Sequence, residues 1–225
     1  MSTLADIREK VIGIVKDDSG KLRNPDDYEQ GINSALMNYS RYKPLRVIDD
    51  VYGAGTNQIL LPVGWSPEFS SIISIEYPIG NFPPTLLDEE DYIVIDRAGT
   101  ALLNFPLDTS ERVRVTYTML RTADDIPDID LHAFCNLAAA YCLEMLANIF
   151  AQTGDSTISA DVVNYRSKST EFAARAKRLL QLYKEHMGIR EDDTTPPASA
   201  VSDLATNYPG GGDRLTHPRW ARKKR

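Results

Sequence analysis

Apolar side chains recur every three or four positions between residues 130 and 187, which predicts two long helices joined by a short loop. The expected apolar face of the first helix consists of Phe134, Leu137, Ala138, Tyr141, Cys142, Met145, Leu146 and Ile149. That of the second consists of Ile158, Val162, Tyr165, Phe172, Ala173, Ala176, Leu179, Leu180, Tyr183 and Met187. Because each face must be covered, we expect the two helices to pack against each other as a hairpin.

The same spacing predicts two shorter helices before this hairpin. The first starts at Thr3, which together with Asp6 has the spacing of a capping box, with Asp in place of the usual Glu or Gln. The second starts at Asn24, an N-cap residue, followed by Pro25 at the first helical position. It ends before Pro44, because a proline pushes the preceding residue out of helical geometry.

Between residues 45 and 121 the period changes to that of strands. Four segments are rich in β-branched and aromatic residues: 58–61, 71–77, 92–95 and 112–118. Glycine and proline clusters separate them, and residues 92–105 have the pattern of a hairpin that turns over Asp96 to Gly99. We expect about five or six short antiparallel strands in a small sandwich or barrel, inserted into the helical domain.

After Gly188 the periodic pattern stops. Residues 189–213 are mostly Thr, Pro, Ser, Asp and Gly, a composition that predicts a flexible linker. The sequence therefore predicts an α+β fold: a four-helix bundle-like domain with an inserted antiparallel β module and a disordered C-terminal tail. The expected division is residues 1–44 for the N-terminal helices, 45–122 for the insert, 123–188 for the hairpin that completes the bundle, and 189–225 for the tail.

Composition places the protein among ordinary soluble proteins. Hydrophobic residues make up 42% of the 225, enough for a real core, and no apolar run approaches the ~20 residues that span a bilayer. The N-terminus is charged from the start and lacks a signal peptide, so we expect a cytosolic site of synthesis and no membrane partner. Cys135 and Cys142 lie roughly 10 Å apart along one helix, too far to pair, and are expected to be buried thiols.

Candidate chemistry is sparse. The acidic runs 88–91 and 124–125 have the composition of cation ligands, but consecutive charges of this kind more often form a solvated surface. Asp128 or Asp130 can cap the third helix, and His186 near a helix C-terminus suits the helix dipole. No nucleophile triad, glycine-rich phosphate loop or zinc spacing occurs in the sequence. We therefore expect no enzyme activity, no cofactor and no metal.

Charge is unevenly distributed. Residues 213–225 contain six basic residues and one acid, a net charge of +5, so the first 212 residues carry −12 of the total of −7. Trp and Arg together are typical of an interface anchor. The candidate partner-binding residues are Arg214, Leu215, His217, Arg219, Trp220, Arg222, Lys223, Lys224 and Arg225. Docking on a protein partner is the favoured interpretation; contact with DNA and no specific role are the alternatives.

The order and character of these segments resemble the head-to-tail adaptor proteins (head completion or connector proteins) of tailed bacteriophages. The resemblance covers about residues 3–188. It rests on the helices around Leu4–Arg8 and Tyr28–Leu36, the Ile72–Pro78 strand with the Tyr92–Phe105 hairpin, the acidic Asp124–Pro127 linker, the alanine-rich helix 131–152, and the long Tyr165–Met187 helix with Phe172 and Arg175.

The resemblance implies a ring, usually of twelve copies, under the portal at the head–tail junction of the virion. Such rings act in head completion after viral genome packaging, and they extend the DNA channel. The implied partners are the portal protein, neighbouring adaptor copies and tail, stopper or nozzle proteins, with DNA passing through the lumen without specific binding. An acidic body fits that passage, and a tethered basic end suits docking on the portal. Nucleic-acid binding through the basic end is the alternative function.

Overall fold

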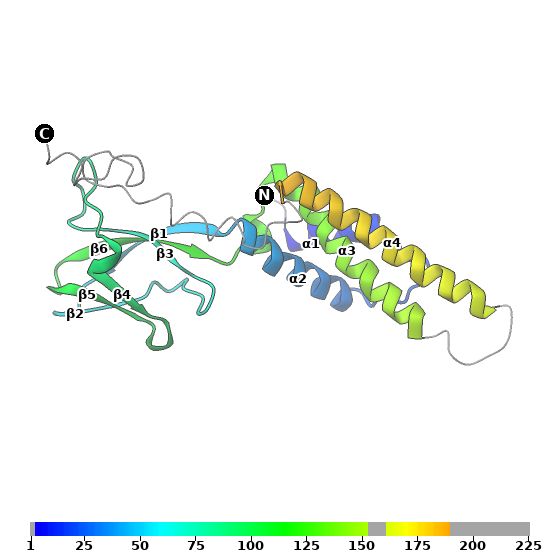
Figure 1. The fold of residues 1–225 in the computed structure, drawn as a ribbon, viewed down its shortest axis with the longest axis horizontal. Helices are drawn as coiled ribbons and strands as arrows, with labels where there is room; N and C mark the ends of the chain where they lie inside the picture. Colours follow the sequence, from blue (N-terminus) through cyan, green and yellow to red (C-terminus); the bar gives the residue numbers. More distant parts are fainter. Residues whose placement is uncertain (1–2, 153–160, 190–225) are drawn as a thin grey trace, which may run out of the picture.

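The computed structural model describes residues 3–152 and 161–189, and of residues 161–167 the backbone alone. These residues form an α+β protein with four α-helices and two small antiparallel sheets (Figure 1). The helices are α1 (Leu4–Val15), α2 (Asp26–Tyr42), α3 (Asp128–Gln152) and α4 (Asp161–Met187). The strands are β1 (Leu45–Tyr52), β2 (Thr56–Leu60), β3 (Ile72–Glu76), β4 (Tyr92–Ile95), β5 (Thr100–Leu107) and β6 (Arg112–Met119). Single 3₁₀ turns lie at η1 (Glu89–Asp91), η2 (Asp96–Ala98) and η3 (Ala123–Asp125).

The predicted α+β class is confirmed, whereas the helices do not form specifically a four-helix bundle. The helix α3 is central, and α1, α2 and α4 each pack along it. Every residue from Ala133 to Leu143 is buried except Tyr141, which is half-buried. The single apolar face predicted for this helix was therefore too narrow. A helix that is apolar on nearly all sides belongs in the middle of a core, and the small Ala138, Ala139 and Ala140 let its neighbours approach.

The predicted hairpin of α3 and α4 is confirmed by extensive packing between the two helices. The Phe150 and Phe172 rings stack with centroids 5.4 Å apart, and Ala176 and Tyr183 are buried against α3. Ala173, predicted on the same face, is exposed, because the covered stripe of α4 is narrower than its apolar pattern. Three other predicted members of that face, Ile158, Val162 and Tyr165, lie outside the described side chains.

The predicted N-terminal cap is correct for α1 and wrong for α2. The Thr3 side chain accepts a hydrogen bond from the Asp6 backbone N–H, and the Asp6 carboxylate accepts one from that of Thr3, so the predicted capping box is present. The predicted cap of α2 is wrong: Pro25, one residue later than expected, is the N-cap. The Asp27 carboxylate closes this turn instead, by accepting a hydrogen bond from the Arg23 backbone N–H at 2.8 Å.

Strands β1 to β6 and their connections, residues 45–119, form what we call the β module. Its two antiparallel three-stranded sheets have the orders β1-β6-β3 and β2-β5-β4. Their inward side chains share a second core, separate from that of the helices, made by Ile59, Ile75, Ala101, Leu103, Leu107, Val113, Val115 and Tyr117. The arrangement is a small sandwich, because alternate residues of each strand point to the shared core.

The number of strands and the hairpin between β4 and β5 agree with the sequence prediction. Strand β1 was not among the four segments singled out, because Asp49 and Asp50 interrupt its apolar pattern. Both carboxylates are satisfied across the strand pair. Asp49 accepts a hydrogen bond from the Tyr117 hydroxyl at 2.8 Å, and Asp50 pairs with Arg114 at 2.8 Å. Cross-strand partners thus allow charged residues in the middle of a strand.

By length and composition, α3 is apolar enough to cross a membrane, unlike the expectation from the sequence that no run approaches this length. However, 72% of the qualifying window is buried inside the protein. The other three helices cover it, which is how a core helix of a folded protein meets the same test.

Two glycines in helices test how tightly α2 packs on α3. A Cβ added at Gly31 of α2 would lie 2.6 Å from Cys142 Sγ and 3.4 Å from the Ala138 carbonyl oxygen, whereas one added at Gly13 of α1 would meet nothing within 4 Å. We predict that Gly31→Ala lowers the free energy of unfolding by ~1–2 kcal/mol, because overpacking outweighs the gain in helix propensity. Urea denaturation measures this change.

The matched control is Gly13→Ala, which has the same chemistry in open space. It should raise the free energy of unfolding by ~0.5–1 kcal/mol, the gain from helix propensity alone. Equal effects of the two substitutions would show that α2 and α3 are not closely packed at Gly31.

Candidate functional site: the junction between the helices and the β module

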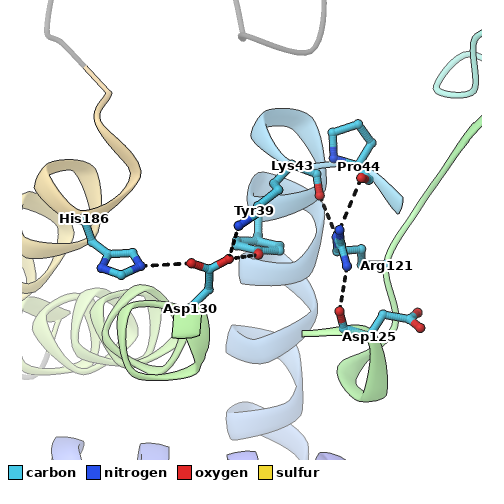
Figure 2. A network of polar contacts seen from close by, with 7 residues as sticks. All are labelled: Tyr39, Lys43, Pro44, Arg121, Asp125, Asp130 and His186. Carbon is cyan, nitrogen blue, oxygen red and sulfur yellow. Dashed lines mark hydrogen bonds and ion pairs between the residues drawn. The ribbon is translucent and has the colours of Figure 1, made fainter. Parts of the chain in front are cut away.

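A buried carboxylate joins the ends of three helices. Asp130 lies in the first turn of α3 and is 4% exposed. Its Oδ2 accepts hydrogen bonds from the Tyr39 hydroxyl at 2.6 Å and Lys43 Nζ at 2.5 Å, both at the end of α2 (Figure 2). Its Oδ1 lies 3.0 Å from Nε2 of His186, in the last turn of α4. The contact holds α2, α3 and α4 at one point.

The electrostatics of Asp130 follow from these partners. Burial alone raises the pKa of the carboxyl group, but hydrogen bonds from Lys43, Tyr39 and His186 outweigh burial and lower it to about 2. Burial, followed by the hydrogen bond to Asp130, raises the pKa of Tyr39 well above its ordinary range. Asp130 is therefore a carboxylate and Tyr39 a neutral donor at neutral pH. The Lys43 and His186 side chains are partly exposed, at 44% and 38%, whereas the Asp130 side chain is buried.

A second set of contacts centres on Arg121, in the segment between β6 and η3. Its guanidinium donates hydrogen bonds to the carbonyl oxygens of Lys43 at 2.7 Å, Asp125 at 2.6 Å and Pro44 at 3.4 Å (Figure 2). It also lies over the Tyr39 ring, 5.9 Å from the centroid. A cation that binds carbonyl groups at a helix C-terminus satisfies acceptors that the helix leaves unpaired.

The two clusters meet where the chain crosses between the modules. The first crossing runs from α2 through Lys43 and Pro44 into β1, and the second runs from β6 through Arg121 into η3. The Arg121 backbone N–H donates to Ser40 Oγ at 3.1 Å, and Ser40 is fully buried. Both crossings are therefore hydrogen-bonded to the end of α2. We call the contacts of Asp130 and Arg121 together the joint.

The residues singled out in the sequence as candidate sites fall in different parts of the chain. The nine candidate partner-binding residues, from Arg214 to Arg225, lie outside the described part of the chain. In the acidic run 88–91, Asp88 is the N-cap of η1, and all four residues are exposed except Asp91, which is half-buried. Asp125 caps its own turn through Thr122. Cys135 and Cys142 are free and buried, as predicted. Within the described residues, no group of three or more His, Cys, Asp or Glu could hold a metal ion.

Two of the sequence interpretations change at the junction. Asp130 was considered as a cap of α3, but the hydrogen-bond partners of its carboxylate are Lys43, Tyr39 and His186. His186 was explained by the helix dipole, but it also contacts Asp130 directly. The sequence shows at this point only an aspartate at the start of a strongly apolar helix. That pattern indicates an N-cap residue as well as it indicates a buried carboxylate.

Comparison with known proteins adds no assignment. No family model matches the chain, and no curated protein matches it.

We predict that Asp130→Asn lowers the free energy of unfolding at pH 7 by about 2 kcal/mol. The pKa of Asp130 is about 2 in the folded protein against the ordinary 3.8, so its carboxylate stabilises the fold above about pH 4. That contribution is lost as the pH falls from about 4 toward 2. The difference between the two proteins should shrink over that interval, measured by urea denaturation at each pH.

The control is Asp128→Asn, two residues earlier and exposed. Its effect should stay below about 0.5 kcal/mol at any pH, as for other surface substitutions. If Asp130→Asn and Asp128→Asn behave alike, the buried cluster does not stabilise the junction.

Proposed function

We propose that the protein is a structural adaptor that forms a ring beneath the capsid portal of a tailed bacteriophage, joins the portal to the tail and extends the DNA channel. The observation that carries the proposal is the joint at Asp130 and Arg121 between two modules with separate cores. A subunit that connects two assemblies must keep its two ends at a fixed angle. Fastening both chain crossings to the end of α2 provides such an angle.

The four helices serve, in this proposal, as the helical part that faces the portal, and the β module projects toward the tail. The two modules lie end to end along the longest axis of the molecule (Figure 1). The β module has eleven acidic and four basic residues and no lysine. An acidic surface around a lumen repels the phosphate backbone, so DNA slides past without being held.

Exposed apolar side chains support contacts with other chains. Val63 and Phe82 are fully exposed on loops of the β module, and Met37 and Ile129 are more than half exposed on the helices. Single exposed apolar residues are common, but large ones at loop tips are typical of surfaces that another chain covers. Neighbouring copies in a ring, and tail or stopper proteins below it, are the partners that this proposal assigns to them.

The basic C-terminal end is proposed to dock on the portal. Truncation after Gly188 should weaken binding to purified portal protein, because it removes the six basic residues together with Leu215 and Trp220. Replacing both Arg219 and Trp220 by Ala should weaken binding by at least ~2 kcal/mol, about thirtyfold in affinity. Tyr208→Ala, an aromatic residue outside the basic end, is the matched control and should leave affinity unchanged.

Electron microscopy of the mixture of full-length protein and portal tests the assembly itself. A closed ring on the portal would support the adaptor proposal, and absence of any complex would contradict it. Truncated protein that binds as tightly as the full chain would remove the role of the tail while leaving the ring in place.

The second candidate function is nucleic-acid binding through residues 214–225, favoured by the +5 charge of residues 213–225. It predicts that the full-length protein binds DNA fragments with an affinity that falls steeply with salt, with a slope near the number of phosphates contacted. Fluorescence anisotropy of a labelled duplex at several salt concentrations measures that slope. A flat response would remove this function without affecting the adaptor proposal.

A further inference from the structure

The outer face of the β2-β5-β4 sheet carries exposed apolar side chains on its two outer strands, while Thr100 on its central strand is buried. In the sheet register Leu60 lies opposite Thr100, which lies opposite Ile95, and Gln58, Leu102 and Ile93 form the neighbouring row. Paired residues point to the same side of a sheet, and the alternate residues Ile59, Ala101 and Leu103 belong to the core. Leu60, Leu102, Ile93 and Ile95 therefore share the outer face. Leu60 is 70% and Ile93 66% exposed.

One edge of this face is acidic. Asp91 continues the same alternation beyond Ile93 and accepts a hydrogen bond at 2.6 Å from Nδ2 of Asn104, which is also on the outer face. Asp88, Glu89 and Glu90 precede it and are exposed. None of the paired residues on this face is basic. The surface thus offers apolar contact beside four consecutive carboxyl groups.

The outer face of the β1-β6-β3 sheet has a different character. Arg114 lies between Asp50 and Glu76 and forms ion pairs with both, at 2.8 and 3.5 Å. Arg112 also reaches Asp50, at 3.3 Å. The charges on that face are paired with charges of opposite sign. The acidic edge beside Ile93 is instead complementary in charge to a basic segment.

A segment of this chain has the complementary composition. Residues 214–225 contain six basic side chains with Leu215 and Trp220 among them, so they carry the positive charge that the face lacks and apolar groups that can pack on it. A partly apolar face beside carboxylates is satisfied by such a segment through burial of aromatic and aliphatic groups and through charge complementarity.

Length also permits this contact. The helix α4 ends at the junction, because His186 contacts Asp130, which contacts Lys43 just before β1 (Figures 1 and 2). Between Ile189 and Arg214 there are 24 residues, which can span up to ~80 Å. Strand β1, with eight residues, is roughly 27 Å long. The segment can therefore reach any part of the β module.

We propose that residues 214–225 dock on the outer face of the β2-β5-β4 sheet, with Leu215 and Trp220 against Leu60, Ile93 and Ile95 and the basic side chains beside residues 88–91. This contact does not depend on the adaptor function and forms in the absence of a portal. In this proposal the C-terminal end lies on this sheet whenever no other partner binds it.

A spin label on the full-length protein tests the contact. Ala221→Cys introduces a thiol between Trp220 and Arg222, and labelling is selective because Cys135 and Cys142 are buried and burial raises the pKa of both thiols. With the isoleucine methyl groups isotope-labelled, the signals of Ile93 and Ile95 should be broadened by the spin label at low salt. The broadening should fall at ~1 M salt, where charges are screened within about 3 Å.

Matched variants locate the surface. Ile93→Lys places a like charge opposite the basic segment and should abolish the broadening at Ile95. Ile48→Lys is the control, since Ile48 is 61% exposed on the outer face of the other sheet. It should leave the broadening at Ile93 and Ile95 unchanged. Equal effects of the two variants would overturn the proposal. So would a protein with neither substitution in which the spin label broadens Ile48 more than Ile93 and Ile95.

Two further measurements keep the test decisive if Ile93→Lys fails to fold. Replacing Lys223, Lys224 and Arg225 by Gln leaves the β module unchanged and should reduce the broadening severalfold; no reduction would contradict the charge complementarity. Mixing spin-labelled with isotope-labelled molecules then shows whether the segment docks on its own or a neighbouring copy, and either result fulfils the proposal. No portal is present, so the outcome is independent of the adaptor test.

Discussion

The buried carboxylate of Asp130 determines where the helices meet beside the β module. Removing Asp130 from water is costly unless its carboxylate is paired and hydrogen-bonded, and its partners are Tyr39 of α2, Lys43 directly after α2 and His186 of α4. Because these donors lie at helix ends, satisfying the carboxylate also fixes which end of each helix faces the β module. The direction in which the chain leaves α4 follows from the same contact.

The joint differs in kind from the two cores that it connects. Each core is held by non-directional apolar packing, which tolerates small rearrangements. Between the cores, Arg121 binds three main-chain carbonyl groups, and hydrogen bonds to fixed acceptors are directional. The orientation of the β module therefore depends on a few polar atoms, which is consistent with the adaptor role proposed above.

Sequence patterns predicted most of the elements and little of the joint. Helical and strand periods are local, so α1, α4 and the β4–β5 hairpin were found, and the capping box at Thr3 followed from spacing. The partners of Asp130 lie up to 91 positions away from it in the sequence, and no local pattern distinguishes a buried aspartate from an N-cap. Strand β1 was missed for the same reason, since the partner that satisfies Asp50 is 64 positions away. The candidate docking residues of the C-terminal end lie outside the described chain.

The placement of the two chain crossings has a consequence for exchanging one part of this protein without the other. The chain leaves the helices at Pro44 and returns at Arg121, and the two points are joined by a hydrogen bond. Neighbouring ends mean that a short turn can close the helical part, so the segment between them behaves as an interchangeable cassette. A different domain could therefore be grafted at this point of this chain on the same helical scaffold, and the whole of α3, with its buried alanines, would be untouched by the exchange.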